Sequence, residues 1–592
     1  MILRRLCEAA PQFEFPPPGY QKGPVKWIVD LDAEGQCRGF VRTVGDETKK
    51  NDRGKEMAFP FVQRTSGVAA QLLADKADYT LGVVDPGAKP NEPEKVKQRH
   101  AAFMKLLDDC AAQTSFSPLE AVREFLEPEH QLPELPSELQ QGDMVTFRVD
   151  GQLLIEQPEI REYWAKWIAA TQASGPEAPC LVCGKPGPVA NPHPRPIKGV
   201  PGGNPGGCAL VSVNARAFGS YGHGMDLTQA PVCWTCADTY AQTLNALLAS
   251  PNHHFRLQDR LVYVFWTREP TEFDLGTVFI DPQPEQVQKL LETVHTGQGT
   301  VSLDRNQFYA LSLSGSRGRV IVRDWLETTV GHVQQNLGHY LEALDLVDPD
   351  GQTATPPGLY ALMAGLIPGK GRDPWKELPP NLAAQFVHAV LNGNPLPDTL
   401  LARAVARARA EQGLTRPRAA LIKLCLLLSS HPEEGLALTP DLNPELDDAA
   451  YLCGRLLAIL ENIQSAAIPG AKATLIDKYY GTASTAPAAI FGLLMRQAQA
   501  HLGKLRKNKE GAHHALQQAL EDVAGRLGQQ FPRVLDLNQQ GKFALGYYQQ
   551  RAADRKARSD AAAAKKQNAG ATGTATKLIA DSDIPEGGND NV

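Results

Sequence analysis

The chain has 592 residues, of which 42% are hydrophobic and 21% are charged, and its formal net charge is −6. These values are typical of a water-soluble globular protein with several domains, and no apolar run of about 18 residues that could span a membrane is present. Met1 to Leu6 lack the apolar core and cleavage site of a signal peptide, so we expect a cytoplasmic protein whose ten cysteines are reduced thiols or metal ligands.

Charges are unevenly distributed along the chain. Residues 120–138 are acidic, residues 403–423 and 496–509 are basic, and residues 184–225 contain neither Asp nor Glu. Basic patches on an acidic chain favour a protein that contacts a polyanion and also docks on other proteins. The alternative for each single patch is a solvated helix face.

The first 174 residues alternate between strand and helix patterns. Residues 26–32 and 37–44 alternate like two strands around a turn at 33–35. Asp30 and Asp32 share one face of the first strand, but without a third ligand they indicate a hairpin edge rather than a metal site. Further along, the patterns predict helices at 69–77 and 95–109 and strands at 144–149 and 153–155.

The rest of the chain changes from irregular to helical. Residues 175–236 are dense in Gly and Pro, which excludes a long helix or a regular sheet. Strands follow at 261–267 and in a hairpin formed by 308–313 and 319–323. From about residue 325 the helical period dominates, and the tail from 551 is predicted to be disordered. The clearest helices are predicted at 441–464, 491–506 and 512–527.

Two Cys-x-x-Cys motifs form the sharpest local signal. Cys180 pairs with Cys183, and Cys233 pairs with Cys236, so four thiolates are available to one tetrahedral zinc ion. A redox role would need one motif in a thioredoxin-like strand–helix context, which the flanking sequence lacks. Because four thiolates leave no open coordination position, the sequence predicts a structural zinc rather than a catalytic one.

These patterns predict an α+β fold, in which a mixed α/β N-terminal region with a zinc-stapled loop insertion is followed by an all-α C-terminal helical bundle. The predicted domains are an α+β region at 1–174, the insertion at 175–240, strands that complete the N-terminal region at 241–330, a helical connector at 331–438, the bundle at 439–550 and the tail at 551–592.

The insertion carries a Gly- and Pro-rich loop over residues 193–207. Its glycines would let the backbone approach a phosphate, which Arg195 and Lys198 could neutralise and Asn204 could contact. Asn214, which follows in sequence, is a further candidate for hydrogen bonding to nucleic acid. The alternatives are a plain surface loop and, for Asn214, a turn residue.

Two other basic segments are candidate nucleic-acid contacts. A loop over 49–55, followed by a Thr-Ser-Gly turn, could grip phosphates and probe a groove. The second segment, 496–507, lies on the helix predicted at 491–506 and directly after it. A solvated surface is the alternative for both. The candidate residues are Lys49, Lys50, Arg53, Lys55, Arg64, Thr65, Ser66, Arg496, Lys504, Arg506 and Lys507.

The sequence contains no recognisable catalytic signature. Phosphate-loop, zinc-protease and Gly-x-Ser-x-Gly motifs are missing, and the His, Asp and Glu residues form no cluster of nuclease type. We therefore predict that the protein is not an enzyme.

Longer strings of residues carry information about the family. They are 64–67, 78–82, 197–200, 210–215, 217–222, 308–313, 323–325, 451–456 and 541–548. Through these strings the sequence from Met1 to about Arg551 resembles the large subunit of the type I-C (Dvulg subtype) CRISPR surveillance complex, Cascade.

The resemblance implies a non-catalytic subunit beside the 5′ handle of a guide RNA. It would recognise the PAM, the short motif that flanks the target in double-stranded DNA, while the guide reads the target by base pairing. It would also help to form the R-loop and recruit a helicase–nuclease. Other implied partners are the Cascade backbone and handle-binding subunits, and a small subunit made from an internal start in the same gene, which the C-terminal bundle resembles.

Two other functions stay open from the sequence. A zinc-dependent nuclease of the same defence system would cut the target itself, and a purely structural scaffold would use its basic patches to bind proteins. A non-ATG internal start is expected between about Leu438 and Asp447, because a start at Met495 would delete the helix predicted at 441–464. A start at Met363 would instead add a loop-rich segment.

Overall fold

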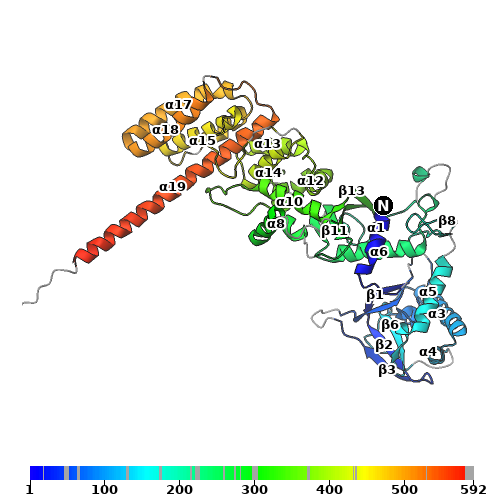
Figure 1. Ribbon diagram of the computed structural model, residues 1–592. Coiled ribbons are helices and arrows are strands. Elements are labelled where there is room, and N and C mark those ends of the chain that lie inside the picture. The colour runs from blue at the N-terminus through cyan, green and yellow to red at the C-terminus, as the bar shows by residue number, and fades with distance from the viewer. Residues whose placement is uncertain are drawn as a thin grey trace, which may run out of the picture. The chain divides into compact units, whose positions relative to one another are not determined.

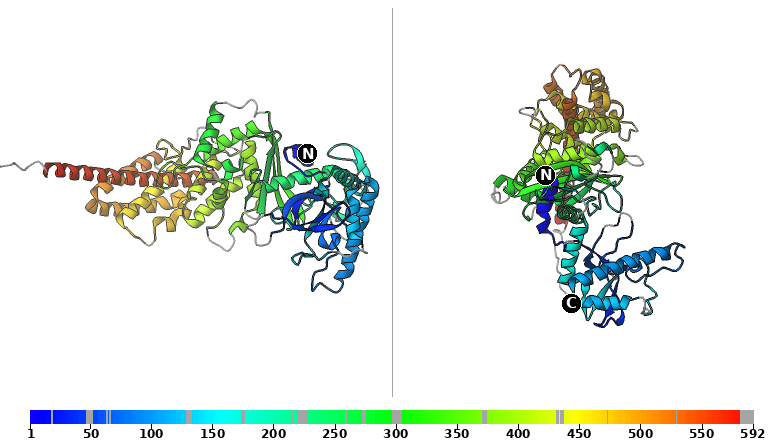
Figure 2. Two further views of the ribbon diagram at one scale, coloured as in Figure 1. Left: turned by 90° about the horizontal axis from the view of Figure 1, so that it is seen from below. Right: turned by 90° about the vertical axis from the view of Figure 1, so that its right-hand side faces the viewer.

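The computed structural model shows two compact units (Figure 1; Figure 2). Unit 1 comprises Met1–Ser250 with Ser314–Ile321, and unit 2 comprises Pro251–Leu313 with Val322–Val592. The structure describes residues 1–17, 19–45, 52–62, 64, 67–127, 133–172, 176–213, 216–219, 227–257, 260–271, 275–280, 282–296, 305–369, 374–430, 433, 437–471, 473–528 and 530–580.

Unit 1 is built around a small mixed sheet. Strand β2 (Trp27–Leu31) pairs antiparallel with β3 (Cys37–Arg42) and parallel with β6 (Met144–Val149), which also pairs with β5 (Ala74–Lys76) and β7 (Gln152–Leu153). Val29 and Phe147 are register partners on the two central strands and are fully buried. Apolar faces of the helices α3 (Glu92–Thr114), α4 (Pro118–Leu126) and α5 (Pro158–Gln172) complete this core.

Two further parts of unit 1 carry the candidate sites. Strands β1 (Tyr20–Val25) and β4 (Lys55–Pro60) form an antiparallel ribbon. The insertion contains a short hairpin of β8 (Glu177–Pro179) and β9 (Pro186–Pro188), and it ends in helix α6 (Trp234–Ala249). Helix α1 (Ile2–Ala9) packs on α6.

Unit 2 begins with an antiparallel sheet in the order β10-β11-β12-β13, of which the hairpin tip Ser314–Ile321 belongs to unit 1. All seven residues of β11 (Leu261–Thr267) are buried, which explains its continuous apolar run. The other strands are β10 (His254–Leu257), β12 (Gln307–Ser316) and β13 (Arg319–Thr329). The helices that share a core with this sheet are α7 (Leu275–Ile280), α8 (Pro284–Thr296), α10 (Val330–Leu344), α11 (Leu359–Ala364), α12 (Pro380–Asn392), α13 (Asp398–Glu411) and α14 (Arg416–Leu427).

The C-terminal part of unit 2 is a helical bundle. It consists of α15 (Ala449–Ala467), α16 (Leu475–Ala483), α17 (Pro487–Asn508), α18 (Glu510–Leu527) and the long α19 (Leu537–Ala580). Helices α15 and α19 cross at Gly454 and Gly546, where an added Cβ would lie 2.0 Å from the carbonyl oxygen of Phe543 and 2.2 Å from that of Tyr451. Only glycine permits this approach. The glycines in the strings 451–456 and 541–548 are therefore required for the packing of α15 on α19.

The α+β class with a helical C-terminal region is confirmed, as are most predicted strands and helices. Two predictions are wrong. The strand predicted at 153–155 ends at Leu153, and a 3₁₀ turn follows at Leu154–Glu156. The helix predicted at 69–77 is absent as well. Leu73 adopts a left-handed backbone (φ 57°), which interrupts a helix, and β5 and the short helix α2 (Ala77–Thr80) follow.

Several predicted boundaries also differ, and two of these differences matter for the C-terminal part. The helix predicted from Asp441 begins at Ala449, where the Asp448 carboxylate accepts bonds from the N–H groups of Ala450 and Tyr451. Residues 551–580 continue α19 instead of being disordered. The first half of this segment is rich in Ala, Lys and Arg, which favour helix. In the described part of the chain, no helix has both the length and the apolar character needed to cross a membrane.

Candidate metal centre and nucleic-acid surfaces

The first Cys-x-x-Cys motif lies in the tight turn between β8 and β9. The N–H of Cys180 donates to the carbonyl oxygen of Lys185 (2.9 Å), and the N–H of Gly184 donates to that of Cys180 (2.8 Å). Gly184 has φ 75°, which lets the chain turn back directly after Cys183. This turn brings both thiols to one end of the hairpin.

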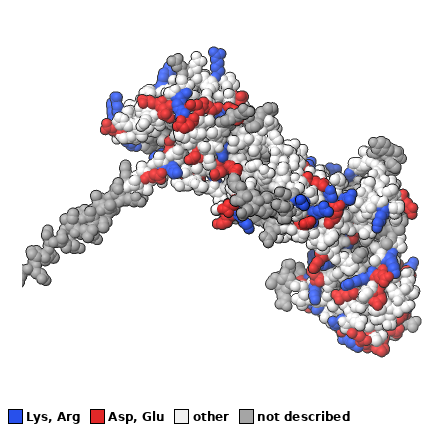
Figure 3. All heavy atoms as spheres, viewed as in Figure 1, with Lys and Arg blue, Asp and Glu red and all other residues white. Residues whose placement is uncertain are grey.

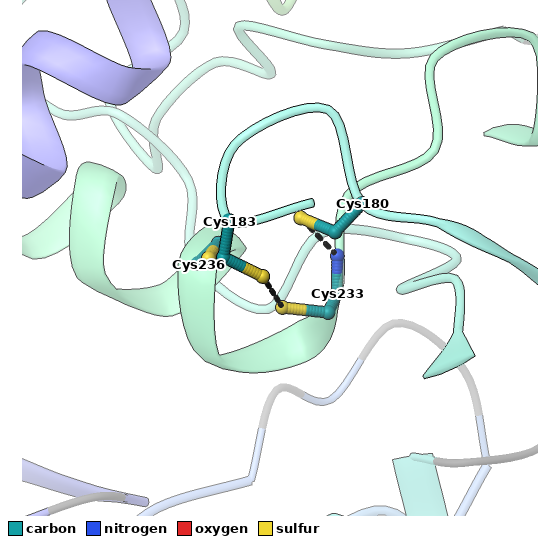
Figure 4. A group of neighbouring side chains, drawn as sticks. All are labelled: Cys180, Cys183, Cys233 and Cys236. Carbon is teal, nitrogen blue, oxygen red and sulfur yellow. Dashed lines mark hydrogen bonds between the residues drawn. The ribbon is translucent and has the colours of Figure 1, made fainter. Parts of the chain in front are cut away.

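The second motif forms the start of helix α6. Cys233 is the residue before the first helical turn, and Cys236 lies within that turn. Cys233 also pairs in a β-bridge with Val189, directly after β9. The hairpin and the helix end are therefore joined by backbone contacts, and the two motifs face each other (Figure 4).

Backbone N–H groups act on the sulfur of Cys180. Burial opposes its ionisation, but hydrogen bonds from the amides of Cys183, Cys233 and Val182 outweigh it and lower the pKa of Cys180 to about 7. The N–H···S distances are 3.4 Å from Val182 and 3.3 Å from Cys233. Burial raises the pKa of Cys233 and of Cys236, and the neighbouring thiols add to the increase. Four thiols in this arrangement can all ionise only if a cation compensates their charge.

The spacing of the sulfurs fits a zinc ion. Tetrahedral zinc with bonds of about 2.3 Å holds its sulfurs about 3.8 Å apart. The Sγ atoms of Cys183 and Cys233 are 3.9 Å apart, and all four sulfurs lie within 4.8 Å of one another (Figure 4). The predicted grouping of the four cysteines is thus confirmed, and zinc would cross-link the β8–β9 hairpin to α6.

A fifth cysteine beside this cluster was not predicted. The Cys7 thiol of α1 contacts the carbonyl oxygen of Cys236 (3.5 Å), and burial raises the pKa of Cys7 to about 12. It joins helix α1 to the metal centre without belonging to the set of four. A single cysteine near the N-terminus gives no spacing signal from which this position could be inferred.

Arg195, a predicted phosphate contact, is used inside unit 1. Its guanidinium forms an ion pair with Asp238 of α6, donates to the carbonyl oxygen of Tyr20 (2.6 Å) and lies 5.2 Å from the centre of the Phe61 ring. Only 11% of the Arg195 side chain is exposed. The structure therefore places Arg195 as a link between the loop, strand β1 and α6.

The glycines of the loop approach another backbone segment. The N–H of Gly315, at the tip of the β12–β13 hairpin, donates to the carbonyl oxygen of Pro201 (2.7 Å). An added Cβ on Gly315 would lie 2.3 Å from the nitrogen of Gly203. The close approach that was expected for a phosphate is thus occupied by a hairpin.

The remaining loop candidates are at the surface. Lys198 and Asn204 are exposed, and the N–H of Lys198 donates to the Asn245 side chain (2.8 Å). Asn214 lies outside the described residues. Lys198 and Asn204 are thus free to contact a ligand, and their predicted role stays a prediction.

The base of the basic loop before β4 is firmly held. The Asp52 carboxylate accepts from the N–H groups of Gly45 (3.1 Å) and Gly54 (3.1 Å), and the N–H of Lys55 donates to the Thr43 hydroxyl (2.9 Å). The side chains of Arg53 and Lys55 are exposed. Lys49, Lys50, Thr65 and Ser66 lie outside the described residues.

Arg64 is bound within its own segment. Its guanidinium forms an ion pair with Asp75, donates to the carbonyl oxygen of Ala69 (2.6 Å) and lies 4.0 Å from the centre of the Tyr79 ring. Asp75 is fully buried, and burial raises its pKa although the Arg64 charge opposes the increase. Arg64 therefore compensates a buried carboxylate.

The two basic segments of the helical region differ in accessibility. Arg496, Lys504, Arg506 and Lys507 are all exposed on α17, and the last two also suit the negative end of the helix dipole. Part of the segment 403–423 is used inside the fold instead of forming a surface patch. Arg416 donates to the carbonyl oxygens of Leu346, Ala354 and Thr355. Arg418 and Lys423 are buried and donate to the carbonyl oxygens of Gly365 and Asp345, respectively. On the face drawn in Figure 3, basic and acidic side chains are interspersed.

The model of the family described as CRISPR-associated protein (Cas_Csd1) matches residues 3–554, nearly the whole chain. The chain belongs to this family. In general terms, the family indicates the large subunit of a CRISPR Cascade complex. The comparison with curated proteins finds no match.

Proposed function

We propose that the chain is the non-catalytic large subunit of a type I-C (Dvulg subtype) Cascade in antiviral defence, acting in the cytoplasm. In this role it recognises the PAM in double-stranded DNA, assists R-loop formation and recruits the helicase–nuclease. The observation that carries the proposal is the family match over residues 3–554. In this role the guide RNA recognises the target by base pairing, and the protein recognises the PAM beside the target.

The basic loop before β4 supports a contact with duplex DNA. Asp52 and Thr43 hold the base of the loop, so Arg53 and Lys55 project from a fixed position. Exposed cations on a held loop gain phosphate contacts at a low cost in ordering entropy. Lys49 and Lys50 belong to the same loop in sequence and would add charge to it.

The metal centre supports a structural role and not a catalytic one. Four thiolates would complete the tetrahedral coordination of a zinc ion and leave no coordination position for water or substrate. Within the described residues, no other group of three His, Cys, Asp or Glu side chains lies close enough to hold an ion. The proposed partners are the 5′ handle of the guide RNA, the Cascade backbone and handle-binding subunits, and a small subunit from an internal start.

A PAM-library assay with the assembled complex tests the proposal. We expect that only a few of the flanking sequences in the library support tight binding of the duplex. Replacing both Arg53 and Lys55 by Ala should weaken binding to a similar extent for all flanking sequences. Each lost phosphate contact should reduce the salt slope by about one. Lys166→Ala is the matched control, because Lys166 is 75% exposed and pairs with Glu162 on α5. Equal affinity for all flanks would favour the scaffold, and metal-dependent cleavage by the isolated chain would show an enzyme.

A further inference from the structure

An exposed aromatic ring beside an arginine stands out in unit 1. Phe218 lies in the 3₁₀ turn Arg216–Phe218, and 41% of the residue is exposed. The guanidinium of Arg319, the first residue of β13, lies over this ring, 4.1 Å from its centre. The cation–π contact holds the ring at the surface.

The two segments that carry Phe218 and Arg319 contain basic residues and no acidic ones. Lys198 and Arg317 are exposed, and neither the segment 184–225 nor the hairpin tip 314–321 contains an Asp or Glu. In the described part of the chain, no ion pair involves Lys198, Arg317 or Arg319. Arg195, by contrast, is neutralised by Asp238. These three cations are therefore available to an anionic ligand.

Backbone hydrogen bonds hold the three segments side by side. Ile197 and Cys208 form one β-bridge, and Ala209 and Arg319 form the next. The N–H of Ala209 donates to the carbonyl oxygen of Gly318 (2.8 Å), and that of Val320 donates to Ala209 (3.0 Å). Neighbouring strands lie about 4.8 Å apart, so two successive bridges place the backbones at Lys198 and Arg319 roughly 10 Å from each other. The backbone that carries Lys198, Arg317 and Arg319 is thus held in place without a ligand, and the contact with Arg319 positions Phe218 beside it.

We propose that Phe218, with Lys198, Arg317 and Arg319, binds a single-stranded segment of nucleic acid. A base stacks on the exposed part of the Phe218 ring, and the three cations contact the adjoining phosphates. Every base offers a π-face to an aromatic side chain, whereas the paired bases of a duplex are not accessible for stacking. An acidic protein partner would use the cations but has no comparable use for the ring. This inference rests on the proposed function, because it assigns one nucleic-acid contact of the complex.

Binding of short single strands to the full-length chain tests the site. With labelled RNA and DNA oligonucleotides of about eight nucleotides, Phe218→Ala should weaken binding about tenfold or more, and Phe218→Tyr should retain it. Lys198→Ala and Arg317→Ala should each lower the salt slope by about 0.7. Tyr360→Ala is the matched control, because Tyr360 is 46% exposed in unit 2. Unchanged binding by Phe218→Ala would overturn the proposal.

Photocrosslinking in the assembled complex identifies the strand. One preparation carries 4-thiouridine in the guide, and the other carries 5-iodouracil in the target DNA. A crosslink from either strand to the peptide around Phe218 supports the site and identifies its ligand, whereas crosslinks of both strands only to other peptides of the complex overturn it. The PAM-library assay on the same preparation separates the two proposals. If the wild-type complex selects certain flanking sequences but no strand crosslinks to the peptide around Phe218, only this inference is wrong. If the wild-type complex shows no preference among flanking sequences, the proposed function is wrong.

Discussion

Cys180 and Cys7 lie near the same end of α6, but only Cys180 belongs to the four sulfurs within 4.8 Å of one another. We expect Cys180→Ser to lose about one zinc per chain, and Cys7→Ser to keep it. Because binding energy of a structural zinc contributes to folding, Cys180→Ser should also lower the melting temperature by several degrees, roughly 5 °C or more. Metal analysis and calorimetry measure the two effects. A wild-type protein without zinc would contradict the assignment.

Arg64 and Lys55 were both predicted to contact DNA, but their surroundings separate them. Arg64→Ala should destabilise the protein by about 3 kcal/mol, because it leaves the buried Asp75 carboxylate without its cation. Lys55 is exposed on β4, so Lys55→Ala should leave stability within about 0.5 kcal/mol and weaken DNA binding. Denaturation and duplex binding of both variants test this difference. Equal stability of the two would show that the Arg64–Asp75 pair contributes nothing.

The stability loss of Arg64→Ala should also depend on pH. Burial already raises the pKa of Asp75 in the folded protein, and removal of the Arg64 charge raises it further. A carboxyl group with a raised folded-state pKa stabilises the fold at low pH and loses that contribution as the pH increases. The difference from wild type should therefore be smaller at pH 5 than at pH 8, as measured by denaturant unfolding. The opposite trend would contradict the burial of a charged Asp75.

At the scale of elements, the clearest predictions came from periodic apolar patterns. Strands β6 and β11 have the predicted bounds because their burial is set by local sequence. The functions assigned to Arg64 and Arg195 depended on acidic partners that the local pattern does not reveal: Asp75 lies 11 residues from Arg64, and Asp238 lies 43 residues from Arg195. A glycine-rich loop likewise indicates a close approach without showing what approaches. Here it is the hairpin tip at Gly315.

The contact between that loop and the hairpin can be tested with one methyl group. Gly315→Ala would place a Cβ 2.3 Å from the nitrogen of Gly203, and this backbone cannot move freely. We expect a loss of about 1–3 kcal/mol, as for overpacked cores. Gly206→Ala is the control, because nothing lies within 4 Å of its added Cβ. Thermal unfolding compares the two variants, and equal stability would show that the loop does not pack on the hairpin in solution.

At the scale of the whole molecule, the bundle is both a domain-like unit and part of a larger core. Tyr451 of α15 and Ala544, Leu545 and Tyr548 of α19 join the core that contains α10 to α14. A separate small subunit made of the bundle would expose these four residues. We therefore expect such a product to remain bound to other subunits instead of accumulating free.

The position of the internal start follows from how α15 begins and what holds it. Asp448 caps α15 and also accepts from Lys542 of α19 (2.6 Å), so a product that starts between Leu438 and Asp447 retains the cap and this ion pair. A product from Met495 lacks all of α15 and would expose the apolar side chains of α17 and α19 that pack on it. Intact mass of small species that co-purify with the complex should give a start in this range. Synonymous codons over 438–447 should abolish the species and leave the full-length chain intact. A product beginning at Met495 would show that α15 is dispensable for the bundle.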